Sequence, residues 1–126
     1  MDEVKNLIDD LGIAAFEANT KIASFALISK EGELIYQTEN WDLNSSMEGI
    51  LKVINGEHLF ILNDAEFLVK ESNAKGIITT NDLGMGHVIF AFFQGGTLVS
   101  YAMQGADPIE VLTFLSNNIS KFNGKI

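Results

Sequence analysis

The stretch TTNDLGMGHVIF places two glycines and a histidine between two apolar segments. Gly84 and Gly86 could belong to a loop that holds a phosphate, and His87 could act as a general acid or base. A phosphate-binding glycine loop opens a helix, however, so that backbone N–H groups and the helix dipole face the anion. Here an apolar segment of strand length comes next, no lysine follows directly, and Asp82 would repel a phosphate. We therefore interpret the stretch as a corner between strands, in which the glycines supply positive φ angles.

The other side chains that could perform chemistry are scattered along the chain. His58 and His87 are the only histidines, neither has the spacing of metal ligands, and no motif places a serine or an acid beside them. The acidic pair Asp9-Asp10 falls on a predicted solvated helix face, and Glu31 falls at the tip of a predicted hairpin. Cysteine is absent, which excludes disulfides and thiolate metal sites. We therefore expect no catalytic residue, no metal site and no cofactor, and we predict that the protein is not an enzyme.

The charge of the chain disfavours several kinds of partner. Seventeen acidic residues stand against eight lysines and no arginine, which gives a formal net charge of −9. Nucleic acids are normally bound by clustered lysine and arginine, so we expect no binding to nucleic acid. The acidic N-terminus lacks the basic flank of a signal peptide, and no apolar run approaches the ~18 residues of a membrane span. We expect a single cytoplasmic domain over residues 1–126.

Hydrophobic periodicity predicts three helices and six or seven strands around this corner. The helical patterns cover residues 2–19, 46–55 and 108–122. The strand patterns cover residues 22–29, 33–38, 58–62, 65–71, 76–81, 87–93 and 97–103.

Capping signals mark the starts of the later helices. Ser45 with Glu48 three residues on reads as a capping box for the middle helix, and Gly56 lies where that helix stops. Asp107 reads as the cap of the last helix, with Pro108 at its first position. The residues of the last helix that we expect to face inward are Ile109, Leu112, Leu115, Ile119 and Phe122.

The central strands predict the layer arrangement. Both faces of residues 88–93 are apolar, so the sheet needs cover above and below. The two terminal helices have complementary apolar stripes and can cover one face, while the short middle helix covers part of the other. We therefore predict a layered α/β (α+β) fold with a central antiparallel sheet of six or seven strands.

Two stretches resemble a known family. ELIYQTENWDLNSSMEGILKVI is similar to the profilin pattern of a strand, a short polar link and a helix. LNDAEFLVKESNAKGIITTNDLGMGHVIFAFFQGGTLVSYAM is similar to profilin's hairpin, Gly-x-Gly corner and paired last strands. Together with the terminal helices the resemblance covers nearly the whole chain, and it is greatest to the divergent archaeal (Asgard) profilins. It implies a cytoskeleton-associated protein that binds monomeric actin and controls its polymerisation and nucleotide exchange.

The resemblance also implies a set of actin-binding candidates. In profilins the actin face comprises the later strands, the end of the middle helix and the start of the last helix. The residues of this chain at those places are Lys70, Ser72, Thr79, Asn81, Phe90, Phe92, Gln94, Asp107 and Glu110. Phe90 and Phe92 share one face of a strand, and which face of the later strands meets solvent stays open.

Two other family ligands are disfavoured by the residues present. Profilins hold proline-rich peptides between aromatic side chains of the terminal helices, but the tryptophan and tyrosine of the first helix are absent here. Phe16 and Phe122 alone make an incomplete aromatic groove. The family's basic strand residues, which help to bind phosphoinositides, become residues 79–82, TTND. We therefore expect proline-rich peptides and phosphoinositides to bind weakly or not at all.

Two alternatives to profilin remain. A roadblock-type domain has similar architecture and works as a dimeric scaffold for a small GTPase, but it typically has three strands after the middle helix. The patterns here indicate four or five, which favours profilin and a monomer. The second alternative is a small-molecule sensor with a pocket inside the sheet, which would copurify with a ligand or melt at a different temperature when one is bound.

Overall fold

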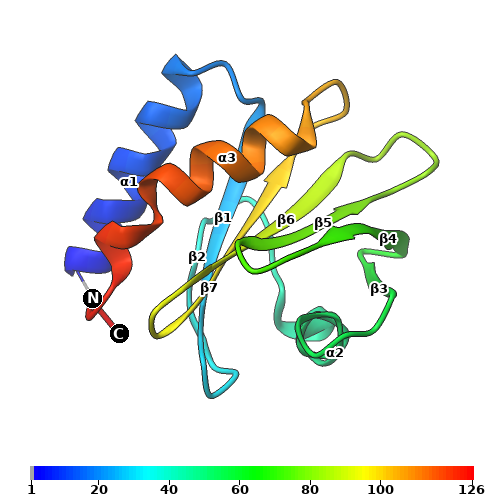
Figure 1. Ribbon diagram of the computed structural model, residues 1–126, viewed down its shortest axis with the longest axis horizontal. Coiled ribbons are helices and arrows are strands. Elements are labelled where there is room, and N and C mark those ends of the chain that lie inside the picture. Colours follow the sequence, from blue (N-terminus) through cyan, green and yellow to red (C-terminus); the bar gives the residue numbers. More distant parts are fainter. Residues whose placement is uncertain (1) are drawn as a thin grey trace.

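A computed structural model describes residues 2–126 of the chain (Figure 1). Its helices are α1 (Asp2–Glu17), α2 (Met47–Ile54) and α3 (Pro108–Asn118), with short 3-10 helices η1 (Asn44–Ser46) and η2 (Ile119–Phe122). Its strands are β1 (Ile22–Ser29), β2 (Leu34–Gln37), β3 (Leu59–Leu62), β4 (Ala65–Ser72), β5 (Gly76–Thr80), β6 (His87–Phe93) and β7 (Gly96–Ala102). All seven pair antiparallel in one sheet, in the order β2-β1-β7-β6-β5-β4-β3.

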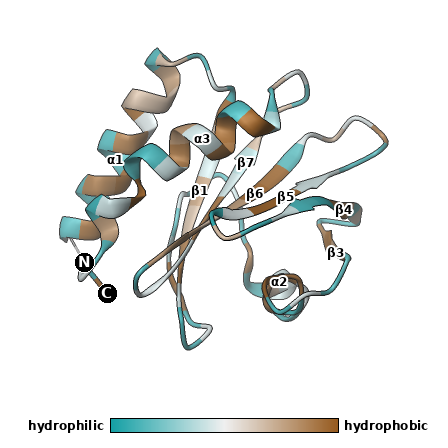
Figure 2. Cartoon of the chain, in the orientation of Figure 1, coloured by the Kyte–Doolittle hydropathy of each residue, from teal (hydrophilic) through white to brown (hydrophobic). Residues whose placement is uncertain are grey.

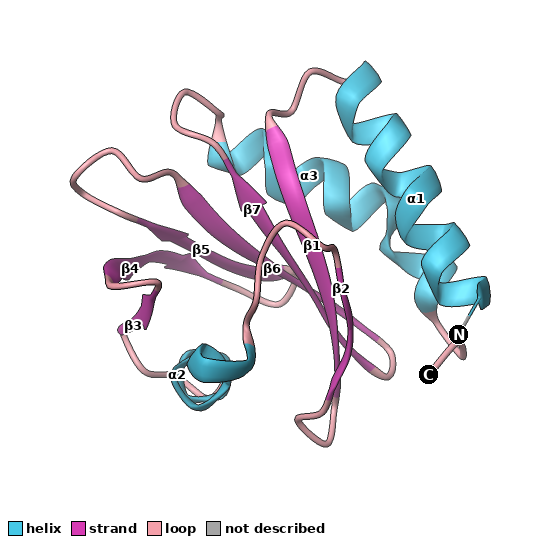
Figure 3. Ribbon diagram, turned by 180° about the vertical axis from the view of Figure 1, so that it is seen from behind, coloured by secondary structure: helices cyan, strands magenta, loops and turns pink. Residues whose placement is uncertain are grey.

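The helices cover the two faces of the sheet as predicted. α1 and α3 lie on one face, and α2 lies on the other (Figures 1 and 3). The two ends of the chain lie close together, and the Lys125 Nζ is 2.9 Å from the Glu3 carboxylate. The layered α+β architecture with terminal helices on a common face is therefore confirmed. No helix among residues 2–126 is both long and apolar enough to span a bilayer.

Alternation along the strands divides the interior into two cores. In β6, Ile89 and Ala91 pack under α1 and α3, whereas Val88 and Phe90 pack on the side of α2. Successive side chains of a strand point to opposite faces of the sheet. In a strand that is buried on both faces, neither of the two alternating sets of side chains is polar. Figure 2 shows the result: brown, apolar segments run through the central strands and along β3, while the helices alternate brown and teal.

The two predicted caps differ in outcome. The Asp107 carboxylate accepts hydrogen bonds from the backbone N–H groups of Ile109 at 3.0 Å and Glu110 at 3.3 Å, so the cap of α3 is confirmed. The capping box at Ser45 is wrong, because α2 is preceded by η1 and the residue that caps α2, Ser46, makes no side-chain cap bond. The chain enters this turn instead through Asp42, whose carboxylate accepts the N–H of Asn44 at 2.9 Å.

Two further details of the helices differ from prediction. α1 ends at Glu17 rather than at residue 19, and the chain reverses through Asn19 and Lys21, which both have positive φ. Ile109 was predicted to face inward but is exposed, and Val111 is buried in its place. The buried residues Val111, Leu112 and Leu115 lie within about 100° of one another around the helix axis, and Ile109 lies outside that face.

The glycine corner is confirmed as a turn between β5 and β6. Gly84 and Gly86 have φ of +88° and +91°, a region that favours glycine. A Cβ on Gly86 would lie 2.5 Å from the carbonyl oxygen of Ala102, so this position also needs the absence of a side chain. The Asn81 side chain holds the turn, because its Oδ1 accepts the backbone N–H groups of Leu83 and Met85.

Candidate functional site

Part of the sheet face that carries α1 and α3 has no helix over it. α3 packs over β6 and the start of β5, while β4 and β3 extend beyond it (Figure 1). In the antiparallel register Leu59 faces Leu68, which in turn faces Thr80. Phe60 and Phe67, one residue away from Leu59 and Leu68, point to the α2 side. We call the uncovered patch the open sheet face, made of Leu59, Ile61, Glu66, Leu68, Glu71 and Thr80.

The open sheet face retains large apolar side chains. Leu59 is 43% exposed and Ile61 is 49% exposed, both on the edge strand β3. Leu68 on β4 is half-buried beside them. Exposed apolar groups gathered on one face, with polar residues around them, are typical of a protein-interaction surface.

The start of α3 continues this surface. Thr80 pairs with His87 across β5 and β6, and the Thr80 Oγ1 lies 2.9 Å from the His87 Nδ1. The imidazole lies near the backbone of Ala106 and the carboxylate of Asp107, just before α3. Burial lowers the pKa of His87, and it outweighs the opposing effects of these two groups. A single row of neighbours therefore joins β3 to the first turn of α3, where Ile109 is 60% exposed.

The charges around this surface are mostly acidic. Glu66, Glu71 and Glu110 are exposed. Lys70 lies at an irregularity in the β4–β5 pairing, and its Nζ is 3.1 Å from the Asp82 carboxylate. Both partners of that pair are about half exposed, so the ion pair itself adds between 0 and about 1 kcal/mol of stability.

The structure brings only some of the predicted actin-binding residues to this surface. Lys70, Asp107 and Glu110 are exposed and border it. Ser72 is exposed, but it pairs with Ile77, so alternation turns its side chain to the α2 side. Gln94 lies in the β6–β7 turn at the far end of β6 from His87, where its N–H donates to Asn123 Oδ1.

Three of the predicted residues are buried, which corrects their assignment to a surface, and a fourth is half-buried. Phe90 is fully buried and packs edge-to-face against Phe60, with ring centroids 5.9 Å apart. The buried Thr79 donates its hydroxyl to the Val88 carbonyl at 2.8 Å. The buried Asn81 donates to the Glu66 carbonyl at 2.8 Å, and Phe92 is half-buried against the α2 core. Thr79, Phe90 and Phe92 lie on the side of their strands that faces α2, and Asn81 directly follows β5.

The residues that sequence reasoning missed are Leu59, Ile61, Leu68 and Ile109. In the stretch HLFIL every residue after the histidine is apolar, so composition does not show which alternating set of side chains faces solvent. A usable signal was the neighbouring β4, where Glu66, Leu68 and Lys70 alternate with Phe67 and Val69. Within residues 2–126, no group of three or more histidine, aspartate or glutamate side chains could hold a metal ion.

Comparisons with known proteins identify the family. No family model matches the sequence. The chain is 31% identical over 87 residues to Odin profilin from Odinarchaeota yellowstonii (strain LCB_4), which covers 68% of this chain and 72% of that protein. It is 29% identical over 122 residues to Loki profilin-1 from Lokiarchaeum sp. (strain GC14_75), with 88% of each covered. The matching chain in the crystal structure of the LokiProfilin1/rabbit actin complex superposes with a TM-score of 0.88 at 24% identity. The match covers 100% of this chain and 98% of that chain.

These matches and the fold define a profilin. The chain belongs to the profilin family, and the predicted resemblance to archaeal (Asgard) profilins is confirmed. The roadblock-type alternative finds no support, because the part of the chain that the structure describes has five strands after α2, β3 to β7.

Proposed function

We propose that this protein binds monomeric actin and thereby regulates actin polymerisation and nucleotide exchange. The observation that carries the proposal is the open sheet face with the adjoining first turn of α3, an apolar surface that no element of residues 2–126 covers. Two further points support it: the chain is a profilin by sequence, and LokiProfilin1, which has the same fold, forms a complex with rabbit actin.

The composition of the surface suits a protein partner. Leu59, Leu68 and Ile109 supply an apolar centre, and Glu71 and Glu110 supply a polar rim, the usual anatomy of a protein–protein interface. Completing the burial of an aliphatic side chain that is already half covered contributes about 1 kcal/mol. A few such side chains, buried together, therefore dominate the affinity, while the rim charges set orientation.

The protein acts by occupying a surface of actin rather than by catalysis. Of the two histidines, His87 is buried, and its Nδ1 lies 2.9 Å from the Thr80 hydroxyl. Because a protein that binds actin must be located with actin, we propose a cytoplasmic, cytoskeleton-associated location. One copy is expected to bind one actin monomer.

Sedimentation velocity tests the proposal directly. Actin held monomeric by a polymerisation-blocking ligand is mixed with the protein at about 10–50 µM, and a one-to-one complex is expected. In parallel, the protein should slow the spontaneous polymerisation of pyrene-labelled actin and change the rate at which monomers release a fluorescent nucleotide. The absence of a complex at about 100 µM, with rabbit actin and with an archaeal actin alike, would contradict the proposal.

A further inference from the structure

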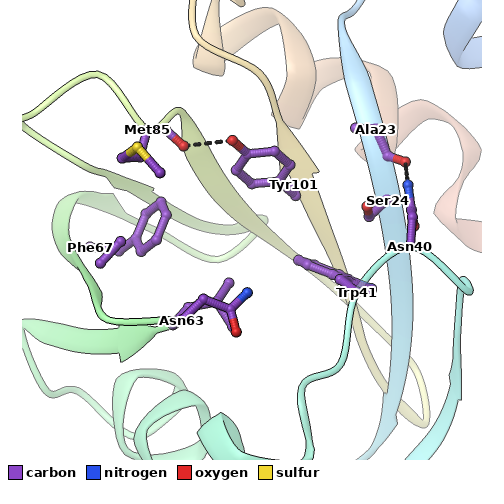
Figure 4. A pocket seen from close by; sticks show the side chains of 10 residues that line it. Ala23, Ser24, Asn40, Trp41, Asn63, Phe67, Met85 and Tyr101 are labelled. Carbon is purple, nitrogen blue, oxygen red and sulfur yellow. Dashed lines mark hydrogen bonds between the residues drawn. The ribbon is translucent and has the colours of Figure 1, made fainter.

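A pocket of about 300 Å³ opens on the α2 side of the sheet, away from the open sheet face (Figure 4). It lies between the start of β1, the link before η1, the β3–β4 turn and the glycine corner. Its volume is at the lower end of the range typical of small-molecule sites. The lining residues that matter for the argument are Ser24, Trp41, Asn63, Phe67, Met85 and Tyr101.

The aromatic walls of the pocket are held in place. The Trp41 indole N–H donates to the Phe25 carbonyl at 3.2 Å, and the Tyr101 hydroxyl donates to the Met85 carbonyl at 2.7 Å. The two rings adjoin each other, with centroids 6.4 Å apart and planes inclined by 48°. Because the indole N–H and the phenol hydroxyl both donate to backbone carbonyls, a ligand would contact these side chains mainly through their ring faces. Rings fixed in advance lose little conformational entropy on binding.

One serine side chain in the lining faces the pocket. Ser24 is only 3% exposed, and its position in β1, opposite Tyr101, turns its side chain into the pocket. A ligand in the pocket can therefore form a hydrogen bond with this hydroxyl. The Asn63 side chain, which lies at the rim in Figure 4, offers a second polar contact.

The charge of the lining selects the kind of ligand. The ten lining residues include no lysine, aspartate, glutamate or histidine, although the whole chain carries −9. An ion in this pocket would lose hydration without gaining an opposite charge, so the lining favours a neutral molecule. Flat rings stack well on tryptophan and tyrosine faces.

We propose that this pocket binds a neutral, ring-containing small molecule, with its ring against Trp41 and Tyr101 and a hydrogen-bonding group on the Ser24 hydroxyl. The site is on the opposite side of the sheet from the proposed actin surface, and the inference does not depend on actin binding. It also gives a physical basis for a sensor-like role within a profilin fold.

Titration of the ¹⁵N-labelled protein with indole, phenol and adenosine tests the proposal. Trp41 is the only tryptophan, so its indole N–H signal reports on this pocket alone. We expect saturable shifts of the Trp41 and Ser24 signals with a dissociation constant below about 1 mM for at least one of these probes. Adenosine monophosphate, tetramethylammonium and a proline decamer, which test an anion, a cation and a peptide, should each bind at least about tenfold more weakly.

Variants at two buried serines separate binding from folding. Ser24→Ala should weaken binding of the best probe about fivefold or more. Ser100→Ala is the matched control, because Ser100 is also a buried serine of the sheet but lies in β7 opposite Phe25, on the side of α1 and α3. It should leave probe binding within about twofold of the wild type. The proposal is overturned if no neutral probe saturates by about 5 mM, if a charged probe or the peptide binds as well, or if Ser24→Ala has no larger effect than Ser100→Ala.

Discussion

Leu59 of β3 lies directly opposite Leu68 of β4, on the side of the sheet away from α2. The adjacent pair, Phe60 and Phe67, is stacked inside the α2 core with ring centroids 5.5 Å apart. Two neighbouring pairs of the same two strands thus have opposite roles: one is packed inside the protein and the other is left for a partner. The difference comes from the helices, because α2 packs against β3 on one face, while on the other face α3 packs against β6 and β5 only.

The two capping signals should differ in their effect on stability. Asp107→Ala removes two hydrogen bonds to the first turn of α3 and should lower the free energy of unfolding by about 1 kcal/mol. Ser45→Ala, at a position whose predicted capping box does not form, should change it by less than about 0.5 kcal/mol. Urea denaturation measures both, and equal losses for the two variants would contradict the assignment.

Local signals were read correctly from the sequence where the chemistry is local. Asp107, Pro108 and the positive φ of Gly84 and Gly86 depend on a few neighbouring residues, and all were anticipated. The capping box at Ser45 failed because a competing local bond, from Asn44 N–H to the Asp42 carboxylate, starts the turn earlier.

The site could be predicted only in part, because exposure is decided by tertiary packing. Phe90 and Ile109 are both apolar residues on elements that carry the family's actin face, yet one is fully buried and the other is 60% exposed. Strands that are apolar on both faces contain no periodic signal for which face is wet. That choice depends on where α3 and α2 end over the sheet, which short-range patterns do not encode.

Acid should destabilise the fold partly through His87. Its pKa is lowered by burial in the folded state, so the unfolded chain takes up the proton first as the pH falls below the ordinary value of about 6.5. The stability that the neutral imidazole contributes is therefore complete above about pH 6.5 and is lost as the pH falls through the lower, folded-state value. His87→Gln should lose this component.

The readout is the difference in unfolding free energy between the wild type and His87→Gln, measured from pH 7.5 to 5. Carboxylates that titrate in both proteins cancel in this difference. We expect the advantage of the wild type to shrink as the pH falls. A difference that grows toward pH 5 would mean that the protonated imidazole is stabilised in the fold.

Proline-rich peptides should bind weakly to the terminal helices. Phe16 is exposed on α1, but Phe122 is buried and packs against Phe93 with ring centroids 5.9 Å apart, so the Phe122 ring is not available to a peptide. A proline decamer is expected to shift the α1 and α3 amide signals only at concentrations above about 1 mM. Saturation at micromolar concentration, mapped to these helices, would show that a peptide groove forms there without the Phe122 ring.

Actin binding should depend little on salt. The apolar centre of the proposed surface is insensitive to screening, and Lys70, the cation on its border, already pairs with Asp82. Raising KCl from about 50 to 300 mM shortens the screening length below ~10 Å and should change the dissociation constant by less than about threefold. The measurement uses polymerisation-blocked actin, and a loss of tenfold or more would indicate that charge pairs carry the affinity.

The most direct test of the central claim compares two isoleucines that are equally exposed on different surfaces. Ile109 on α3 is 60% exposed beside the open sheet face, and Ile13 on α1 is 61% exposed away from it. Each is replaced by glutamate, the fold is checked by thermal unfolding, and binding to monomeric actin is measured by calorimetry. We predict that Ile109→Glu weakens binding at least about tenfold, or ~1.4 kcal/mol, while Ile13→Glu stays within about twofold. Equal effects of the two variants, or a larger effect at Ile13, would contradict actin binding through the open sheet face.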